Sequence, residues 1–169
     1  MAASSGRRAS ALYLRNFVFG VEDSLVSTVG LVSGVAISGL PRAAIFMTGI
    51  ILIFVEAFSM AIGSFLSEGS VEDYLGQKNE SRKLSYVAGI IMFVSYFISG
   101  FVPLFPYLFF EVSGALTLSI VVSLIALFFM GVAKGKMSHT PWIRSGFKMF
   151  LVGGIAIAVG VTIGSLVRL

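Results

Sequence analysis

Long apolar runs separated by short polar segments dominate the sequence. Apolar stretches long enough to cross a membrane occupy residues 16–39, 43–67, 84–106, 112–133 and 145–167. An α-helix rises about 1.5 Å per residue, so about 20 apolar residues cross the ~30 Å hydrocarbon core of a bilayer. We therefore predict an all-α integral membrane protein, with one domain of five transmembrane helices over residues 16–167 and lipid around it.

The polar segments are too short to form a further domain. Residues 1–15 make a small, basic tail, and residues 68–83 make the only sizeable polar link, which we place in the cytoplasm. Pro103 and Pro106 end the third span, because proline interrupts a helix, and Glu111 marks a tight turn before the fourth.

Composition supports a membrane protein and excludes several other classes. Of the 169 residues, 57% are hydrophobic and 12% are charged, whereas about 25% are charged in soluble domains. The absence of cysteine excludes disulfides and thiolate metal sites. The net charge is +4, but the basic residues stand at the ends of apolar runs and form no aromatic-rich stripe, so we expect no nucleic-acid partner.

The distribution of lysine and arginine predicts the orientation in the membrane. With the N-terminus in the cytoplasm, only Arg42 and Arg168 of the 12 basic residues lie outside. The other ten then lie inside, as the positive-inside rule requires. Five spans place the C-terminus on the opposite side.

Three carboxylates fall within the spans. Glu22, Asp23 and Glu56 would each cost roughly 2.5–3.5 kcal/mol at the bilayer centre, so they must lie against protein, water or a cation. For Glu22, an alternative is that it reaches the interface or pairs with Arg15. Asp23 and Glu56 lie nearer mid-membrane and favour a functional interpretation.

Each of the first two spans carries a narrow stripe of small residues with one carboxylate on it. Residues spaced i, i+4, i+7 and i+11 share an arc of about 60° on a helix. That spacing holds for Asp23, Ser27, Gly30 and Gly34, and again for Glu56, Met60, Gly63 and Ser67. Small residues let membrane helices approach closely. We predict a transport path lined by Ser27, Gly30, Gly34, Gly63, Ser64 and Ser67; a second GxxxG pair, Gly160 and Gly164, is expected only to pack.

Folding the first two spans into a hairpin about Pro41 places Asp23 and Met60 at the same depth, with Glu56 about one turn, ~5 Å, beyond. Carboxylate oxygens bind hard cations, and a thioether adds preference for softer ones, so ferrous iron and manganese fit a metal site made of Asp23, Met60, Glu56 and Glu22. Arrival of the metal would displace protons. In the alternative interpretation, Met60 is only apolar filler.

Glu68 and Glu72, one turn apart, and the adjacent Asp73 follow the second span. They form either a cation-collecting cytoplasmic entrance or a solvated helix end. His139 is the only histidine and lies in a basic loop, and the sequence contains no nucleophile elbow, HExxH or Walker motif. We therefore expect no enzyme and no permanently bound cofactor.

Five segments, in order, resemble the vacuolar iron transporter family. The first is NFVFGVEDSLVSTVGLVSG (16–34), similar to the family's GxxDGLVS…GLVxG helix, and the second is SMAIGSFLS (59–67), similar to SMxxGEYLS. The others are SGFVPLFPY (99–107), ALFFMGVAKG (126–135) and residues 144–164.

The resemblance implies a homodimer whose first two helices line a cation path and export Fe²⁺ or Mn²⁺ from the cytosol in exchange for protons, with Asp23 and Met60 as ligands. It implies a vacuolar-type organelle membrane or a prokaryotic plasma membrane as the location. The chain departs from the family pattern at Ser24 and Ser64 and lacks the cytoplasmic metal-binding insert of longer relatives. Two alternatives remain open: a passive divalent-cation channel and a non-transporting membrane assembly subunit.

Overall fold

The protein is a bundle of long helices. The computed structural model describes the backbone of residues 2–74, 76 and 81–167, and the side chains of 6–74, 76 and 83–167. The helices are α1 (Ala2–Ile37), α2 (Arg42–Tyr74), α3 (Ser81–Leu104), α4 (Pro106–Phe109), α5 (Val112–Met137) and α6 (Trp142–Leu166). All but the short α4 are long and apolar enough to cross a membrane, and the described residues form no strand. The predicted all-α fold with five spans is confirmed.

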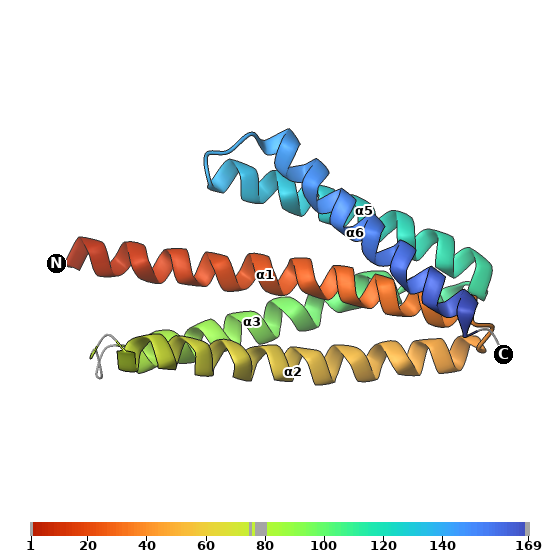
Figure 1. Ribbon diagram of the computed structural model, residues 1–169, viewed down its shortest axis with the longest axis horizontal. Helices are drawn as coiled ribbons and strands as arrows, with labels where there is room; N and C mark the ends of the chain where they lie inside the picture. The colour runs from red at the N-terminus through yellow and green to blue at the C-terminus, as the bar shows by residue number, and fades with distance from the viewer. Residues whose placement is uncertain (1, 75, 77–80, 168–169) are drawn as a thin grey trace.

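Two helices extend beyond the apolar runs that predict them. α1 begins at Ala2 and includes the basic tail, whose alanine and arginine residues are good helix formers. α2 continues to Tyr74 and includes the first part of the polar link. Within that link, Lys78 and Glu80 and the side chain of Arg82 lie outside the described residues. These extensions add helical turns to α1 and α2 at the same end of the molecule (Figure 1).

Glycine and proline set the ends of the helices. Gly39, with φ of +92°, ends α1 in a left-handed conformation that other residues rarely adopt, and Pro41 precedes α2. Pro103 lies in the last turn of α3, and its carbonyl oxygen accepts a hydrogen bond of 2.6 Å from the Ser119 hydroxyl on α5. The third span therefore ends where the two prolines predict.

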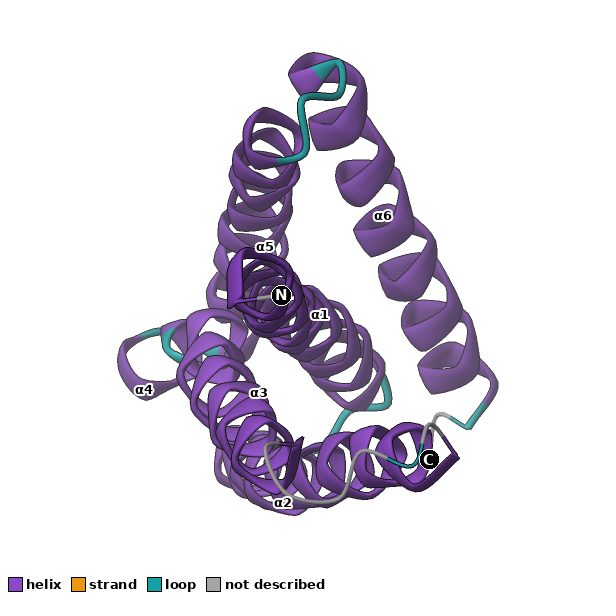
Figure 2. Cartoon of the chain, turned by 90° about the vertical axis from the view of Figure 1, so that its left-hand side faces the viewer, coloured by secondary structure: helices purple, strands orange, loops and turns teal. Residues whose placement is uncertain are grey.

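α1 is the central helix of the bundle. Figure 2 shows it between the α5–α6 hairpin on one side and α2 and α3 on the other. In Figure 1, α1, α2 and α3 run along the long axis, whereas α5 and α6 diverge from α1 towards the end where α1 begins. α1 begins at one end of the molecule and α6 finishes at the other, as an odd number of spans requires (Figure 1).

α6 crosses α1 through two pairs of glycines. A Cβ atom at Gly30 would lie 3.2 Å from the carbonyl oxygen of Ala156, and Cβ atoms at Gly160 and Gly164 would collide with the backbone of Gly30 and Gly34. Gly30 and Gly34 are buried in this contact, away from α2. Gly30 and Gly34 therefore pack against α6 and are not in the pocket lining described below, so their lining of a path stays a prediction. The sequence motif specifies close approach but not which helix approaches.

Candidate membrane-embedded cation site

A pocket of about 860 Å³ opens between α1, α2 and the C-terminal end of α5. Lys134 and Ser138, at the C-terminal end of α5, also line it. At this end the α5–α6 hairpin diverges from α1 (Figure 1). α1 contributes Arg15, Asn16 and Glu22 to its lining, and α2 contributes Ser59, Met60, Gly63, Ser64 and Ser67. Of the predicted site residues, the pocket therefore brings together Glu22 and Met60 with three of the predicted path-lining residues.

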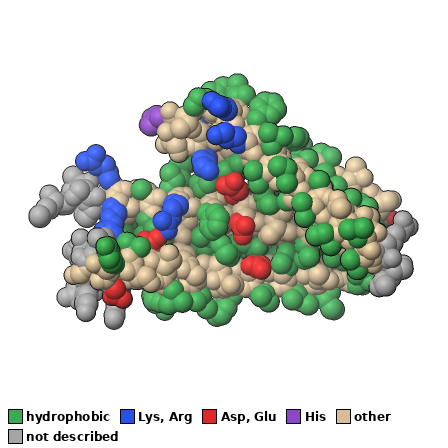
Figure 3. Space-filling view, in the orientation of Figure 1, with side chains coloured by type: hydrophobic (Ala, Val, Ile, Leu, Met, Phe, Trp, Pro, Cys, Tyr) green, Lys and Arg blue, Asp and Glu red, His purple; other side chains and the backbone are tan. Residues whose placement is uncertain are grey.

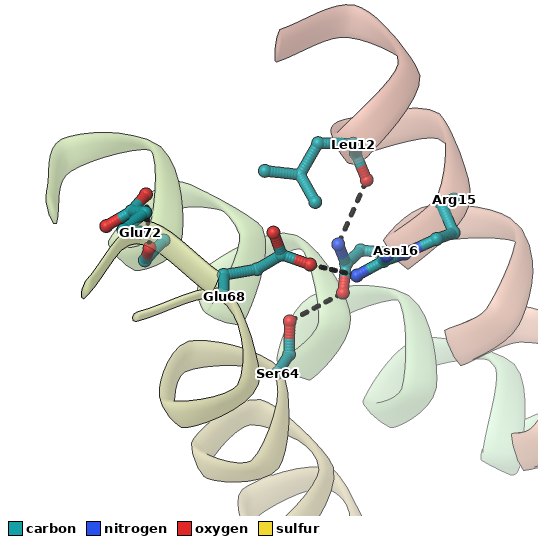
Figure 4. Close-up of polar contacts among 7 residues, drawn as sticks. Leu12, Arg15, Asn16, Ser64, Glu68 and Glu72 are labelled. Carbon is teal, nitrogen blue, oxygen red and sulfur yellow. Dashed lines mark hydrogen bonds and ion pairs between the residues drawn. The ribbon is translucent and has the colours of Figure 1, made fainter. Parts of the chain in front are cut away.

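A hydrogen bond near one end fixes the register of α1 against α2. The Ser64 hydroxyl donates to Oδ1 of Asn16 over 2.6 Å, while Nδ2 of Asn16 donates to the Leu12 carbonyl oxygen over 2.9 Å (Figure 4). Counting seven residues forward from Asn16 and seven back from Ser64 places Asp23 level with Ala57. The sequence predicts that Asp23 is level with Met60, which is three residues from Ala57. The predicted and observed depths of Asp23 therefore agree to within one helical turn.

The three carboxylates within the spans lie close together. Asp23 is near enough to both Glu56 and Glu22 for mutual electrostatic repulsion. All three side chains are only partly buried in the protomer. Figure 3 shows acidic side chains in a row across the middle of one face, whereas Lys and Arg gather towards the end where α1 begins. A row of like charges at this depth attracts cations.

Glu22 pairs with a lysine from a distant part of the chain. Nζ of Lys134, in the last turn of α5, lies 3.8 Å from Oε2 of Glu22, and both residues line the pocket. The sequence-based alternative, pairing of Glu22 with Arg15, is wrong, because Arg15 forms an ion pair with Glu68 instead.

Glu68 and Glu72 lie inside the bundle. Their exposed fractions are 8% and 7%. Glu68 binds Arg15, and Glu72 accepts a hydrogen bond of 2.9 Å from the Ser85 hydroxyl of α3 (Figure 4). The interpretation of both as a solvated helix end is therefore wrong; only Asp73 is exposed. These contacts join α1, α2 and α3 at one end.

The two serines that depart from the family pattern both form contacts between helices. The Ser64 hydroxyl on α2 donates the hydrogen bond to Asn16 of α1 described above. Ser24 is fully buried, and its hydroxyl donates to the Tyr96 carbonyl oxygen on α3 over 2.6 Å. Both hydroxyls therefore attach α1 to a neighbouring helix.

Among the residues that sequence reasoning missed in this region, two come from α3. Met92 lines the pocket and is 3% exposed. Tyr96 is buried, shares a hydrogen bond of 2.7 Å with the Ser27 hydroxyl, and lies near Asp23 and Glu56. No spacing rule relates α3 to the other two spans, so these residues could be assigned only once the packing of α3 against α1 was known.

Among the described residues, no side chain packs on Gly63 in the small-residue stripe of α2. Gly63 and Ser67 are exposed, and a Cβ atom at Gly63 would meet no described atom within 4 Å. This stripe lines the pocket and continues onto the outer surface of α2.

The region offers a mixed set of groups that could bind a cation. Among the described residues, no three His, Asp or Glu side chains are placed to hold a metal ion together. The pocket offers the Glu22 carboxylate, hydroxyls and the thioethers of Met60 and Met92, with Asp23 and Glu56 nearby. Such a mixed set suits a divalent ion of intermediate softness that keeps part of its water.

Comparison with known proteins gives the family. The sequence model of the VIT family matches residues 14–85 and 68–165. The chain is 21% identical to vacuolar iron transporter 1 of Arabidopsis thaliana, covering 92% of this chain and 86% of that protein. It is 28% identical to vacuolar iron transporter homolog 1 of Oryza sativa subsp. japonica, covering 94% and 79%. It is 29% identical to an uncharacterized protein of Methanocaldococcus jannaschii, covering 86% and 84%.

The alignment with the Arabidopsis protein extends over 215 positions, more than the 169 residues of this chain. That relative therefore carries residues within the aligned region that this chain lacks. Two matches of the family model that together reach from residue 14 to residue 165 cover nearly the whole bundle. The chain is an integral membrane protein and belongs to the VIT family.

Proposed function

We propose that this protein transports divalent transition-metal ions, ferrous iron or manganese, out of the cytosol in exchange for protons. The observation that carries the proposal is the pocket between α1, α2 and α5, which combines the Glu22 carboxylate with the Met60 and Met92 thioethers. Members of the same family are named as vacuolar iron transporters. Carboxylate with thioether favours these ions over magnesium or calcium.

The path runs from the pocket to Asp23 and Glu56. Glu22 receives the ion, and the neighbouring Asp23 and Glu56 carry it towards the opposite side. A cation between carboxylates reduces the repulsion between their negative charges, so the three carboxylates favour its passage. Protons that occupy these carboxylates leave when the metal binds and return when it dissociates, which couples the two fluxes.

The working unit is a homodimer in this proposal. The stripe of Gly63 and Ser67 is exposed on α2, and it borders the pocket. Small residues permit close approach of a second membrane helix, so a second copy of α2 fits this face and would enclose the carboxylates of both protomers.

The N-terminus faces the cytosol, because lysine and arginine gather towards the end of the molecule where α1 begins (Figure 3). The pocket opens near this end and therefore receives cytosolic ions. The protein acts without catalysing covalent chemistry and without a resident cofactor.

Uptake into proteoliposomes tests the proposal. Vesicles with an acidic lumen should accumulate Fe²⁺ and Mn²⁺ and exclude Mg²⁺ and Ca²⁺. Absence of uptake of all four ions would exclude transport and favour an assembly subunit, whereas equal uptake of all four would favour an unselective pore.

A further inference from the structure

Lys134 places a positive charge inside the pocket proposed to bind cations. Its Nζ lies 3.8 Å from Oε2 of Glu22, and both side chains line the pocket with Met60. Arg15 also lines the pocket but is held by Glu68. A permanent cation next to the one carboxylate of the pocket lining opposes metal binding, so its presence requires an explanation.

The ion pair is of a kind that exchanges easily. At 3.8 Å it is longer than a direct charge-assisted hydrogen bond, which measures about 2.7–2.9 Å. The side chain of Lys134 is 46% exposed and that of Glu22 is 26% exposed, so the protein encloses neither charge, as in a partly exposed ion pair. Lysine carries its charge on a flexible four-carbon chain, which allows the ammonium group to leave without movement of the helix.

Charge decides which ions can take its place. At equal distance, a divalent ion interacts with the Glu22 carboxylate twice as strongly as a monovalent ion does. The ammonium group is monovalent but tethered beside the carboxylate, which gives it a high effective concentration there. A free monovalent cation therefore interacts with Glu22 no more strongly than the Lys134 ammonium group does, and its concentration beside the carboxylate is lower. A divalent ion interacts more strongly and can displace the ammonium group.

We propose that Lys134 is a specificity-determining residue: it occupies Glu22 as a tethered competitor that divalent cations displace and monovalent cations do not. This inference rests on the proposed function and adds to it a mechanism for rejecting potassium and sodium, which far exceed transition metals in a cell. Met60 and Met92 discriminate among divalent ions, whereas Lys134 discriminates by charge.

The test measures Mn²⁺ binding to the full-length protein in nanodiscs, with KCl replaced by choline chloride at constant ionic strength. The variant is Lys134→Met, which removes the charge and keeps the length of the side chain. The matched control is Lys136→Met, since Lys136 is on the same helix end but contacts the ring of Trp142, 5.5 Å away, outside the pocket lining. Lys134→Leu serves as a second variant that removes the charge without adding a thioether or an oxygen ligand, and thermal unfolding reports on folding.

In choline chloride, Lys134→Met should bind Mn²⁺ roughly threefold to fivefold tighter than wild type, the ratio expected for a partly exposed ion pair. KCl should weaken Mn²⁺ binding to this variant and leave that of wild type and Lys136→Met unchanged. In a Glu22→Gln background, the same substitution should have no effect, because the competed carboxylate is gone.

If wild type binds Mn²⁺ and both Lys134 variants match it in affinity and in response to KCl, the inference is overturned while the proposed function stands. An equal gain in Lys136→Met would also overturn it, since a general charge effect would then be the cause. If wild type and all variants fail to bind Mn²⁺, the proposed function fails and the inference fails with it.

Discussion

A Cβ atom on Gly34 of α1 would lie 2.6 Å from the carbonyl oxygen of Gly160 on α6. Real Cβ atoms do not approach this closely, so glycine on both helices is a condition of the crossing. The crossing lies at the end opposite the diverging α5–α6 turn (Figure 1) and holds the hairpin to the central helix.

Gly160→Ala should therefore destabilise the protein by about 1–3 kcal/mol, the usual cost of overpacking. Its new methyl group would collide with the backbone of Gly30, which cannot move without displacing α1. Thermal unfolding in detergent measures the effect. Gly154→Ala is the matched control on the same helix, because a Cβ atom there meets no described atom within 4 Å; equal losses in both variants would contradict the account.

The Arg15–Glu68 ion pair predicts an asymmetric response to removal of its partners. The Arg15 side chain is 63% exposed and that of Glu68 is 11% exposed. Arg15→Met leaves a buried carboxylate unpaired and should cost about 1–3 kcal/mol, whereas Glu68→Gln leaves an arginine that reaches water and should cost less. The double variant should recover part of the loss in thermal unfolding. If Glu68→Gln lowers the stability more than Arg15→Met does, the unpaired arginine, and not the unpaired carboxylate, is the costlier group, which would contradict the account.

Much of the fold is predictable from the sequence, because each span is a separate apolar run whose length matches the bilayer. Contacts between spans follow no such local rule. The Lys134–Glu22 and Gly34–Gly160 contacts join helices that are far apart in the sequence. A GxxxG motif indicates a close contact but not the helix with which it is made. Glu68 is buried and pairs with Arg15 of α1, a contact between distant positions that hydropathy does not indicate.

The depth of the carboxylates is predictable to about one turn, because the position of the turn determines which residues of two straight helices lie at the same level. Their surroundings are not. Tyr96 and Met92 reach this region from α3, whose placement beside α1 follows from packing of the whole bundle. Sequence alone therefore locates the charges but not the groups that surround them.

Asp23→Asn should abolish metal transport while the protein still folds, because it removes the charge at nearly constant volume. Uptake of Mn²⁺ into proteoliposomes measures it. Glu111→Gln, the same kind of change at the exposed N-cap of α5, should transport normally. Full transport by Asp23→Asn would remove Asp23 from the path.

Met60→Leu should reduce Fe²⁺ transport several-fold and leave any Mg²⁺ leak unchanged, because a thioether binds the softer ion and leucine keeps the volume. The control is Met47→Leu, since Met47 is on the same helix but 65% exposed and away from the pocket lining. Competition between the two ions in one uptake assay gives the ratio directly. An equal decrease for both ions would mean that the sulfur serves only packing.

Glu56→Gln should weaken the dependence of metal uptake on the pH difference, because it removes one of the carboxylates that exchange a proton for metal. Initial uptake rates at a series of lumenal pH values measure this. An unchanged pH dependence would exclude Glu56 from proton coupling.

The most direct test of the central claim is simultaneous measurement of metal entry and lumenal pH in proteoliposomes with an acidic lumen. The account predicts that Mn²⁺ or Fe²⁺ enters, that the lumen becomes more alkaline as it does, and that both changes stop in Asp23→Asn. Metal entry that ignores the pH difference and moves no protons would contradict exchange and indicate a passive channel.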